Sequence, residues 1–363
     1  MKRILAIVLA LVLCLAVFAG CTGKTPSGGN EGDSSTEASA NTKPLVVGYS
    51  NFSSKFSPFF SETAYDQDVW AMTAVSLLNT DRQGAVVELG KTGETRAYNG
   101  TDYTYYGPAD LKITTNDDGT VDYDFELRDD IKFSDGEPLT VDDVIFSMYV
   151  LSDPTYDGNS TFFAQPIKGM QEYRAGMASQ LSLMIEAGRD NTDFTYWDEA
   201  TQTKFWEDLD KAGAAFAQEI VDYCAANELG TTPAEAAAAW GFEIAEDATA
   251  QDFFYQMVAD YGGDLSALSS TESAGSSLSD LGFDPAEYAK GIKTGDSAAS
   301  IEGIQKTGDN SLRVTLTEVD ATAIYQLGVT IAPLHYYGDK DAYDYDNNKF
   351  GFEKGDLSSV RAK

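Results

Sequence analysis

A strict alternation of apolar and charged residues is the feature that most limits how this chain can fold. Between residues 121 and 127, Val, Tyr, Phe and Leu alternate with Asp, Asp and Glu. Because successive side chains of a strand point to opposite faces of a sheet, this pattern predicts a strand with one buried and one solvated face. The preceding Asn116-Asp117-Asp118-Gly119 is typical of a turn. We therefore expect a hairpin from Leu111 to Leu127.

A capped helix is predicted shortly after this hairpin. Ser134-Asp135-Gly136 indicates a tight turn, and Thr140 can cap the first turn of a helix. Asp142 and Asp143 then lie beside the positive end of the helix dipole, where carboxylates are favoured.

Residues 156–300 are predicted to be mainly helical. Apolar residues at steps of three and four indicate an amphipathic helix that Gly230 can end: Phe205, Leu209, Ala212, Phe216, Ile220 and Tyr223. Thr232-Pro233-Ala234-Glu235 is a capping box with proline at the first helical position. Another helix is predicted around Phe253–Tyr261, and the Ser/Gly-rich stretch 269–279 is predicted to be a link.

The N-terminus has the pattern of an export signal. Lys2 and Arg3 precede an apolar run from Ile4 to Phe18, and Ala19-Gly20 lies directly before Cys21. This run falls short of the about 20 residues that span a bilayer, which favours a cleaved signal over the alternative of a transmembrane anchor. The pattern resembles the lipobox of bacterial lipoproteins, which implies lipidation of Cys21 and removal of residues 1–20. Residues 21–43 are polar and lack apolar periodicity, so we expect a flexible linker there.

Charge and cysteine content exclude several classes of protein. The formal net charge is −33, so the basic surface that a nucleic-acid partner requires is missing and docking on anionic lipid is disfavoured. Such acidity is typical of a solvated surface, and it can also steer cationic solutes toward a cleft. After processing, Cys224 is the one unmodified cysteine, so the mature chain forms no intramolecular disulfide.

The sequence contains no recognisable catalytic motif. His335 is the single histidine, which excludes histidine-clustered metal sites and favours a structural hydrogen-bonding role for this side chain. Gly90-Lys91-Thr92 lacks the glycine that a phosphate loop needs at position 85, and a calcium-loop pattern starting at Asp344 fails at Lys349. We expect no enzymatic activity, no metal and no cofactor.

Two segments resemble a known family of receptors. The first contains Leu127-Arg128, Lys132-Phe133-Ser134-Asp135-Gly136 and Pro138-Leu139-Thr140. The second joins the alternating stretch 309–316 to Ile331-Ala332-Pro333-Leu334-His335. Both are similar to the family 5 extracellular solute-binding proteins, which include the oligopeptide- and dipeptide-binding lipoproteins of ABC importers. The resemblance covers about 44–155 and 301–340.

The resemblance implies an α/β fold with mixed sheets, of the type II periplasmic-binding-protein kind, in which ligand lies between two lobes. Residues 44–155 are expected to form first-lobe strand, helix and subdomain, and 301–363 a return to that subdomain. Residues 156–300 are then a helical insertion. Because family members continue beyond this length, the chain is expected to be an N-terminal fragment with the second lobe largely missing.

The expected ligand contacts lie in a loop between a strand and a helix. Leu45–Tyr49 is an apolar run that predicts a buried strand, and apolar residues at helical spacing from Tyr65 onward predict a helix. Carried over from the family, the contacts in the intervening loop are Asn51, Phe52, Ser53 and Phe56. Phe146 matches an aromatic position where peptide receptors often have tyrosine. On spacing alone, the loop phenylalanines fit a plain core role equally well.

The resemblance implies the lipid-anchored receptor of an ABC importer that captures peptides at the cell surface or the periplasmic side of the cytoplasmic membrane. Its expected partners are a peptide ligand, the permease subunits and the membrane that holds the lipid anchor, and the expected state is a monomer. Nickel complexes or oligosaccharides are alternative solutes. A surface lipoprotein or adhesin that uses the helical insertion, and a hydrolase completed by further sequence, are the alternatives outside transport.

Overall fold

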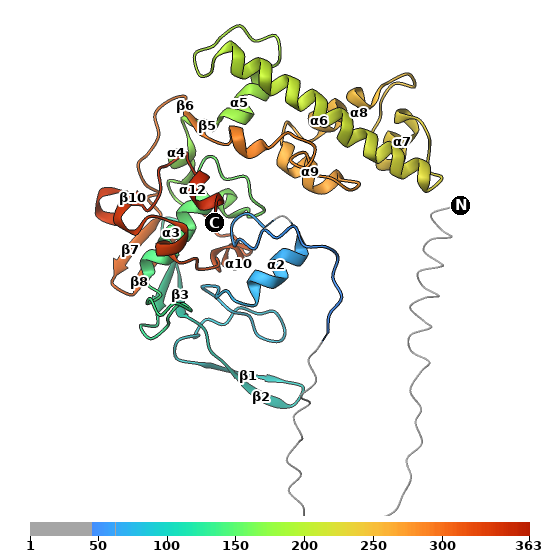
Figure 1. Cartoon of the computed structure of the whole chain (residues 1–363). Helices are drawn as coiled ribbons and strands as arrows, with labels where there is room; N and C mark the ends of the chain where they lie inside the picture. Colours follow the sequence, from blue (N-terminus) through green and yellow to red (C-terminus); the bar gives the residue numbers. More distant parts are fainter. Residues whose placement is uncertain (1–45, 62) are drawn as a thin grey trace, which may run out of the picture. The chain divides into compact units, whose positions relative to one another are not determined.

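The computed structural model describes residues 46–61 and 63–363. The predicted signal peptide, Cys21 and the linker 21–43 lie outside these residues. Tyr49–Lys363 forms a compact unit. It combines several sheets with helices, as Figure 1 shows, so the expected mixed α/β class is confirmed.

A four-stranded antiparallel sheet lies at the centre of the first hydrophobic core. Its strands follow the order β3-β4-β8-β7, with bounds β3 (Ala109–Thr115), β4 (Val121–Leu127), β7 (Ile304–Gly308) and β8 (Ser311–Leu316). The predicted hairpin is thereby confirmed, and β3 begins two residues earlier than expected. Phe125 of β4 lies opposite Leu111 on one side and Leu312 on the other, and all three are buried. The predicted alternation therefore places one face of the sheet in the core.

Helix α3 (Val141–Ser152) packs beside this sheet, next to β7. Thr140 and Asp143 form its capping box, in which the Asp143 carboxylate accepts hydrogen bonds from the main-chain N and Oγ1 of Thr140. The other Asp143 oxygen accepts from the main-chain N of Leu334 at 2.9 Å. Burial raises the pKa of this carboxyl group. One side chain thus begins the helix and fixes the distant segment at Leu334.

The start of the compact unit differs from the prediction. The expected strand at 45–49 does not form in its described part, where Val46 is 86% exposed. Without a paired strand, its main-chain groups lack the ladder that would hold an extended segment in a sheet. The expected helix is present as α2 (Ala64–Ala71) and ends one residue before Met72.

Small elements complete the first core region and its edges. A hairpin of β1 (Glu94–Tyr98) and β2 (Thr101–Tyr105) is separate from the main sheet. The remaining short elements are η1 (Phe162–Ala164), α4 (Met170–Arg174), α10 (Ala323–Leu327), α11 (Leu334–Tyr337), η3 (Lys340–Ala342), β9 (Tyr343–Asp344), η4 (Tyr345–Asn347), β10 (Lys349–Phe350) and α12 (Ser358–Arg361).

A second hydrophobic core belongs to the helical part of the chain. It is built from side chains between Met184 and Tyr288, and it shares no residue with the core around the sheet. Its elements are α5 (Gln180–Ala187), α6 (Glu199–Ala226), α7 (Pro233–Trp240), α8 (Ala250–Asp260), α9 (Leu265–Glu272) and η2 (Pro285–Tyr288). The predicted amphipathic helix and capping box are confirmed in α6 and α7. Two details were wrong, because α6 ends before Gly230 and α9 occupies part of the expected link.

The helical part leaves and rejoins the sheet region through one short pair of strands. β5 (Met177–Ser179) pairs antiparallel with β6 (Gly291–Lys293). The main-chain N of Gly291 also donates to the carbonyl of Gly355 at 2.6 Å, which ties β6 to the segment before α12. None of the helices among the described residues is both long and apolar enough to cross a membrane.

A substitution at Gly213 can test how tightly α6 and α8 pack in the helical core. Gly213 of α6 faces Phe254 of α8, and a Cβ atom at position 213 would overlap the Phe254 ring. We expect Gly213→Ala to lower the free energy of unfolding by about 1–3 kcal/mol, because overpacking outweighs the gain of about 1 kcal/mol in helix propensity. Denaturant unfolding measures this change. The control Gln218→Ala, at an exposed position of α6, should stay within about 0.5 kcal/mol; equal stability of the two variants would contradict the packing.

Candidate functional site

The predicted contact loop, residues 50–60, has a mostly exposed outer half at residues 50–56. Asn51, Phe52, Ser53 and Phe56 are all exposed, with Phe52 at 42% and Phe56 at 43%. The two phenylalanine rings lie 5.8 Å apart between centroids. Large apolar side chains in a soluble domain are more often buried, so a pair of exposed rings is an informative surface feature.

Tyr49 extends this aromatic surface toward helix α2. Its ring centroid lies 5.8 Å from that of Phe52 and 5.6 Å from that of Tyr65. The Tyr49 hydroxyl donates to Asp68 Oδ2 at 3.1 Å, and this hydrogen bond raises the pKa of Tyr49. We call Tyr49, Phe52, Phe56 and Tyr65 the aromatic cluster.

Asp66 of α2 holds the outer half of the loop. Its Oδ2 atom accepts a short hydrogen bond from Ser53 Oγ and another from the main-chain N of Lys55 at 3.3 Å. Between these two residues, Ser54 has φ = 64°, in the left-handed region that residues other than glycine seldom adopt. The Asp66 carboxylate therefore stabilises an unfavourable backbone conformation.

The inner half of the loop belongs to the core. Phe59 and Phe60 are buried, and Ser57 Oγ accepts from both of their main-chain N atoms. Tyr156 OH donates to the carbonyl of Phe59 at 2.9 Å. Trp70 Nε1 donates to Ser61 Oγ at 2.9 Å. The loop is thus fixed from residue 57 onward, whereas its outer half projects from the core.

The structure does not bring Phe146 to this surface. Phe146 is 0% exposed, and its ring makes edge contacts with Phe59 and Phe352 at 6.1 Å. A Cβ atom at Gly338 would lie 2.7 Å from the Phe146 ring, so the ring is closely surrounded. Phe146 acts here as a core side chain, and a ligand contact through it would require the core to open.

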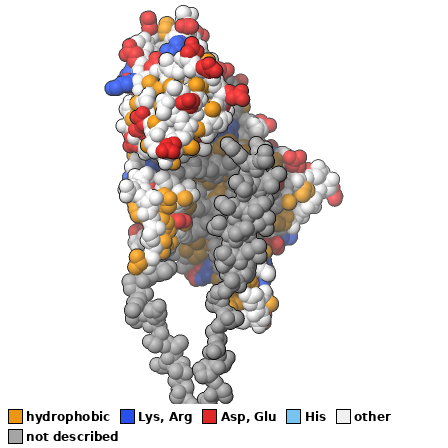
Figure 2. All heavy atoms as spheres, turned by 90° about the vertical axis from the view of Figure 1, so that its right-hand side faces the viewer, with side chains coloured by type: hydrophobic (Ala, Val, Ile, Leu, Met, Phe, Trp, Pro, Cys, Tyr) orange, Lys and Arg blue, Asp and Glu red, His pale blue; other side chains and the backbone are white. Residues whose placement is uncertain are grey.

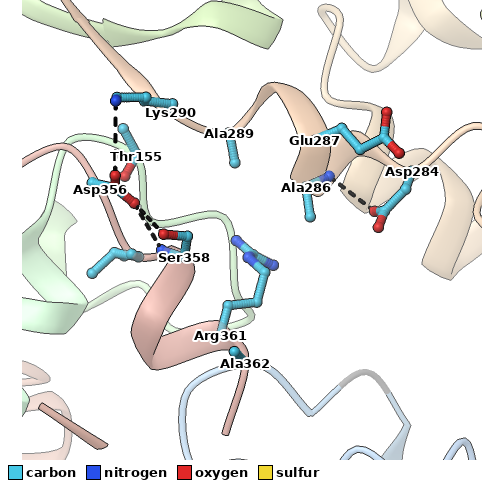
Figure 3. Close-up of a pocket in the computed structure, with 11 residues that line it drawn as sticks. Thr155, Asp284, Ala286, Glu287, Ala289, Lys290, Asp356, Ser358, Arg361 and Ala362 are labelled. Carbon is cyan, nitrogen blue, oxygen red and sulfur yellow. Dashed lines mark hydrogen bonds and ion pairs between the residues drawn. The ribbon is translucent and has the colours of Figure 1, made fainter.

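A pocket lies between the helical part and the end of the described chain. It has a volume of about 480 Å³ and is bordered by the segment 284–290 around η2, by Thr155, and by residues 356–362 around α12. Figure 3 shows the Arg361 side chain extending from α12 into the space between α12 and η2. Pockets of about 300–1,000 Å³ are typical of sites for small molecules.

Charged groups of both signs line this pocket. Lys290 and Arg361 are the cations, and Asp284, Glu287 and Asp356 are the acids. Lys290 Nζ lies 4.0 Å from Asp356 Oδ2 (Figure 3).

Local hydrogen bonds hold two of the acids in the pocket wall. Asp356 also accepts from Ser358, which lowers the pKa of the Asp356 carboxyl group. Asp284 Oδ1 accepts from the main-chain N of Ala286 at 3.0 Å. Both carboxylates are thereby oriented by turns of their own segments.

Arg361 connects the pocket to the contact loop. Its guanidinium lies 4.1 Å from the Phe60 ring centroid and makes a short ion pair with Asp157. Phe60 is in the inner half of the loop that carries Phe52 and Phe56. The contact between Arg361 and Phe60 therefore places the pocket next to the loop.

No pattern in the sequence predicts this pocket. Thr155, the segment 284–290 and the segment 356–362 are far apart in the chain, and each contains ordinary surface residues without a motif. Only the tertiary fold brings them together. The pair Asp284-Pro285 is the one local signal, because Asp284 caps the short helix η2 and Pro285 is its first residue; this pair predicts structure rather than binding.

His335 has a structural role, as expected. Its Nε2 atom lies 2.7 Å from Asp135 Oδ2, and its ring contacts Phe133 at 5.6 Å. The contact with His335 lowers the pKa of Asp135. This pair joins the turn before α3 to α11 and lies apart from the residues that line the pocket.

The surface carries the acidity expected from the net charge. Figure 2 shows acidic side chains scattered over the helical part on the face that it presents, with few lysines or arginines among them. Across the described residues, no group of three or more His, Cys, Asp or Glu side chains is arranged to hold a metal ion. Cys224 is buried and unpaired.

Comparison with known proteins finds one family in the central part of the chain. Residues 105–196 match the family described as "Bacterial extracellular solute-binding proteins, family 5 Middle". The matched range contains β3, β4, α3 and the motif around Lys132–Thr140. This match confirms, over these residues, the predicted resemblance to the family 5 extracellular solute-binding proteins. No curated protein and no solved structure matches the chain.

The matched family indicates a general role for this domain. The matched domain supports a substrate-binding role in transport. Members of this family in general work with ABC permeases outside the cytoplasm and are not enzymes.

The two kinds of phenylalanine in this region should respond differently to truncation. We expect Phe146→Ala to lower the free energy of unfolding by about 3–5 kcal/mol, because it leaves a cavity in the core. Phe52→Ala removes an exposed ring and should change it by less than about 0.5 kcal/mol. Urea unfolding of both variants tests the assignment; a large loss for Phe52→Ala would place that ring in the core instead.

Proposed function

We propose that this protein is the lipid-anchored receptor of an ABC importer and that it captures short peptides outside the membrane. The observation that carries this proposal is the pocket of about 480 Å³ lined by charges of both signs. A short peptide has a positive amino end and a negative carboxyl end, so it needs partners of both signs when it leaves water. Each charged hydrogen bond that it makes is worth about 1.5–3 kcal/mol.

The pocket composition favours peptides over neutral oligosaccharides. Sugar sites commonly use the flat faces of aromatic rings, and none of the described residues that line this pocket is aromatic. Lys290 and Arg361 offer cationic partners for a carboxylate, and Asp284 and Glu287 offer anionic partners for an ammonium group.

The exposed half of the contact loop supplies the second part of the proposed site. Asn51, Phe52, Ser53 and Phe56 present an amide, a hydroxyl and two rings at the surface. Main-chain pairing with an extended peptide along such a loop would give affinity with little side-chain selectivity. In this proposal Phe146 supports the loop from below through Phe59.

The membrane attachment in this proposal is lipidation of Cys21. Two acyl chains at that residue would give stable anchoring, and residues 22–43 would act as a leash. The permease subunits of the importer would then receive the loaded receptor at the membrane surface.

A thermal-shift experiment with the full chain tests the solute class. We expect a tripeptide pool to raise Tm by about 5 °C at a concentration a hundredfold above Kd, since such saturation adds about 2.7 kcal/mol. Pools of oligosaccharides and nickel complexes should leave Tm unchanged. Stabilisation by one of these pools alone would replace the peptide assignment, and no stabilisation by any pool would favour a surface lipoprotein outside transport.

Two lysine variants test whether the pocket is the site. Lys290→Met removes a cation from the pocket lining, whereas Lys293→Met removes one from an exposed position of β6 outside it. We expect only Lys290→Met to reduce the peptide-induced shift in Tm. Equal reductions in both variants would mean that general charge, and not the pocket, determines binding.

A further inference from the structure

A buried carboxylate with one unpartnered oxygen lies under the contact loop. Asp66 is 0% exposed, and its Oδ2 atom accepts from Ser53 and from the main chain of Lys55. Its Oδ1 atom has less than 1 Å² of accessible surface and no hydrogen-bond partner among the residues that the structure describes. Buried polar atoms are almost always hydrogen-bonded, because an unpaired one loses its water without compensation. Oδ1 therefore lacks a donor that a ligand could supply.

The surface above Asp66 suits an organic cation. The Phe52 and Phe56 rings are exposed and meet edge to face at an interplanar angle of 62°. They flank Ser53 and Lys55, the two residues that bond to Asp66. The π face of an aromatic ring attracts an ammonium or guanidinium group within about 6 Å. A carboxylate and two aromatic rings on the same short loop–helix unit together supply the anionic and π-face partners that recognise a positively charged group.

The loop can admit such a group without disturbing the core. Its outer half is held over Asp66 by the bonds from Ser53 and Lys55, and it contains the left-handed Ser54. Its inner half is fixed separately, through Ser57 and Tyr156. Strained backbone held by a few bonds is typical of segments that move when ligand binds. Lifting residues 52–55 would expose Oδ1 and release the Ser54 conformation.

We propose that Asp66 and the rings of Phe52 and Phe56 form a subsite for the ammonium or guanidinium group of the solute, so that the receptor selects positively charged peptides. This inference rests on the proposed function and names its substrate class. The Asp66 carboxylate forms the ion pair through Oδ1, and the two rings cover the cation from the solvent side. The net charge of −33 assists by raising the local concentration of cationic solutes around the protein.

Calorimetric titration of the full chain with matched peptides tests the subsite. Ala-Lys-Ala and Ala-norleucine-Ala differ in a single ammonium group, and N-acetylated forms of both separate the side-chain amine from the amino terminus. We expect the lysine peptide to bind at least about tenfold more tightly, as one charged hydrogen bond predicts. If acetylation alone removes binding, the subsite takes the amino terminus; if norleucine alone weakens it, the subsite takes the side chain.

Three variants distinguish the subsite from general charge effects. Asp66→Asn keeps the shape of the side chain but removes its charge, and it should abolish the preference for the cationic peptide. Asp117→Asn removes the same charge from an exposed turn between β3 and β4 and should keep the preference. The double variant Phe52→Ala with Phe56→Ala alters only exposed rings, so it should fold normally and weaken cation binding about tenfold. An unchanged preference in Asp66→Asn and in the double variant would overturn the inference and leave peptide binding intact.

A small probe keeps the inference testable if no peptide binds. Butylammonium chloride carries the cation without a peptide, and sodium chloride with 1-butanol is its neutral reference. We expect butylammonium to raise Tm of the wild-type chain above this reference and to have no such effect on Asp66→Asn. Equal Tm values in the two solutions for the wild-type chain would refute the subsite independently of the peptide assignment.

Discussion

The pairing of β4 with β8 is the interaction on which the rest of this structure depends. It joins residues 121–126 to residues 311–316, and buried Phe125 and Leu312 face each other across it. On the solvated face, Arg313 forms hydrogen bonds with Asp124 at 2.7 and 3.2 Å, so both faces support the same register. A shift of one residue would move Phe125 to solvent and Asp124 into the core. Because β4 precedes the helical part in the sequence and β8 follows it, this pairing brings the two ends of the sheet region together.

Buried carboxylates complete the closure that the sheet begins. Asp143 holds the segment at Leu334 against α3, and Asp153 accepts from the main-chain N of Gly355 at 2.8 Å. Burial raises the pKa of both groups, so each carboxylate depends on the hydrogen bonds that replace its lost water. Asp153 also accepts from Thr155, which lines the pocket. The same contacts that fix the fold therefore position one wall of the proposed site.

Local patterns in the sequence predicted the elements whose stability is local. The alternation at 121–127, the caps at Thr140 and Thr232 and the periodicity of α6 depend on neighbouring residues, and all appear in the structure. The strand expected at 45–49 would need a partner strand, and the local apolar pattern does not show whether such a partner is present. Helix α9 begins before the Ser/Gly-rich stretch and extends into it, because Asp264 accepts from the main-chain N of Ala267 and caps the helix.

The candidate site was less accessible to sequence reasoning, because its parts come from distant segments. Aromatic spacing alone does not separate exposed Phe52 and Phe56 from buried Phe59 and Phe146. The unpartnered oxygen of Asp66 and the two-sign charge of the pocket are properties of the folded chain.

The paired strands β5 and β6 give the helical part a narrow base. Ser179 and Gly291 are partners in that ladder, so the entry and the exit of more than a hundred intervening residues lie side by side. The helical part, which has its own core, therefore occupies the place that a turn occupies in a β-hairpin. Such a junction allows the helical part to be inserted, enlarged or deleted at one place in the chain while the sheet region keeps its strand register.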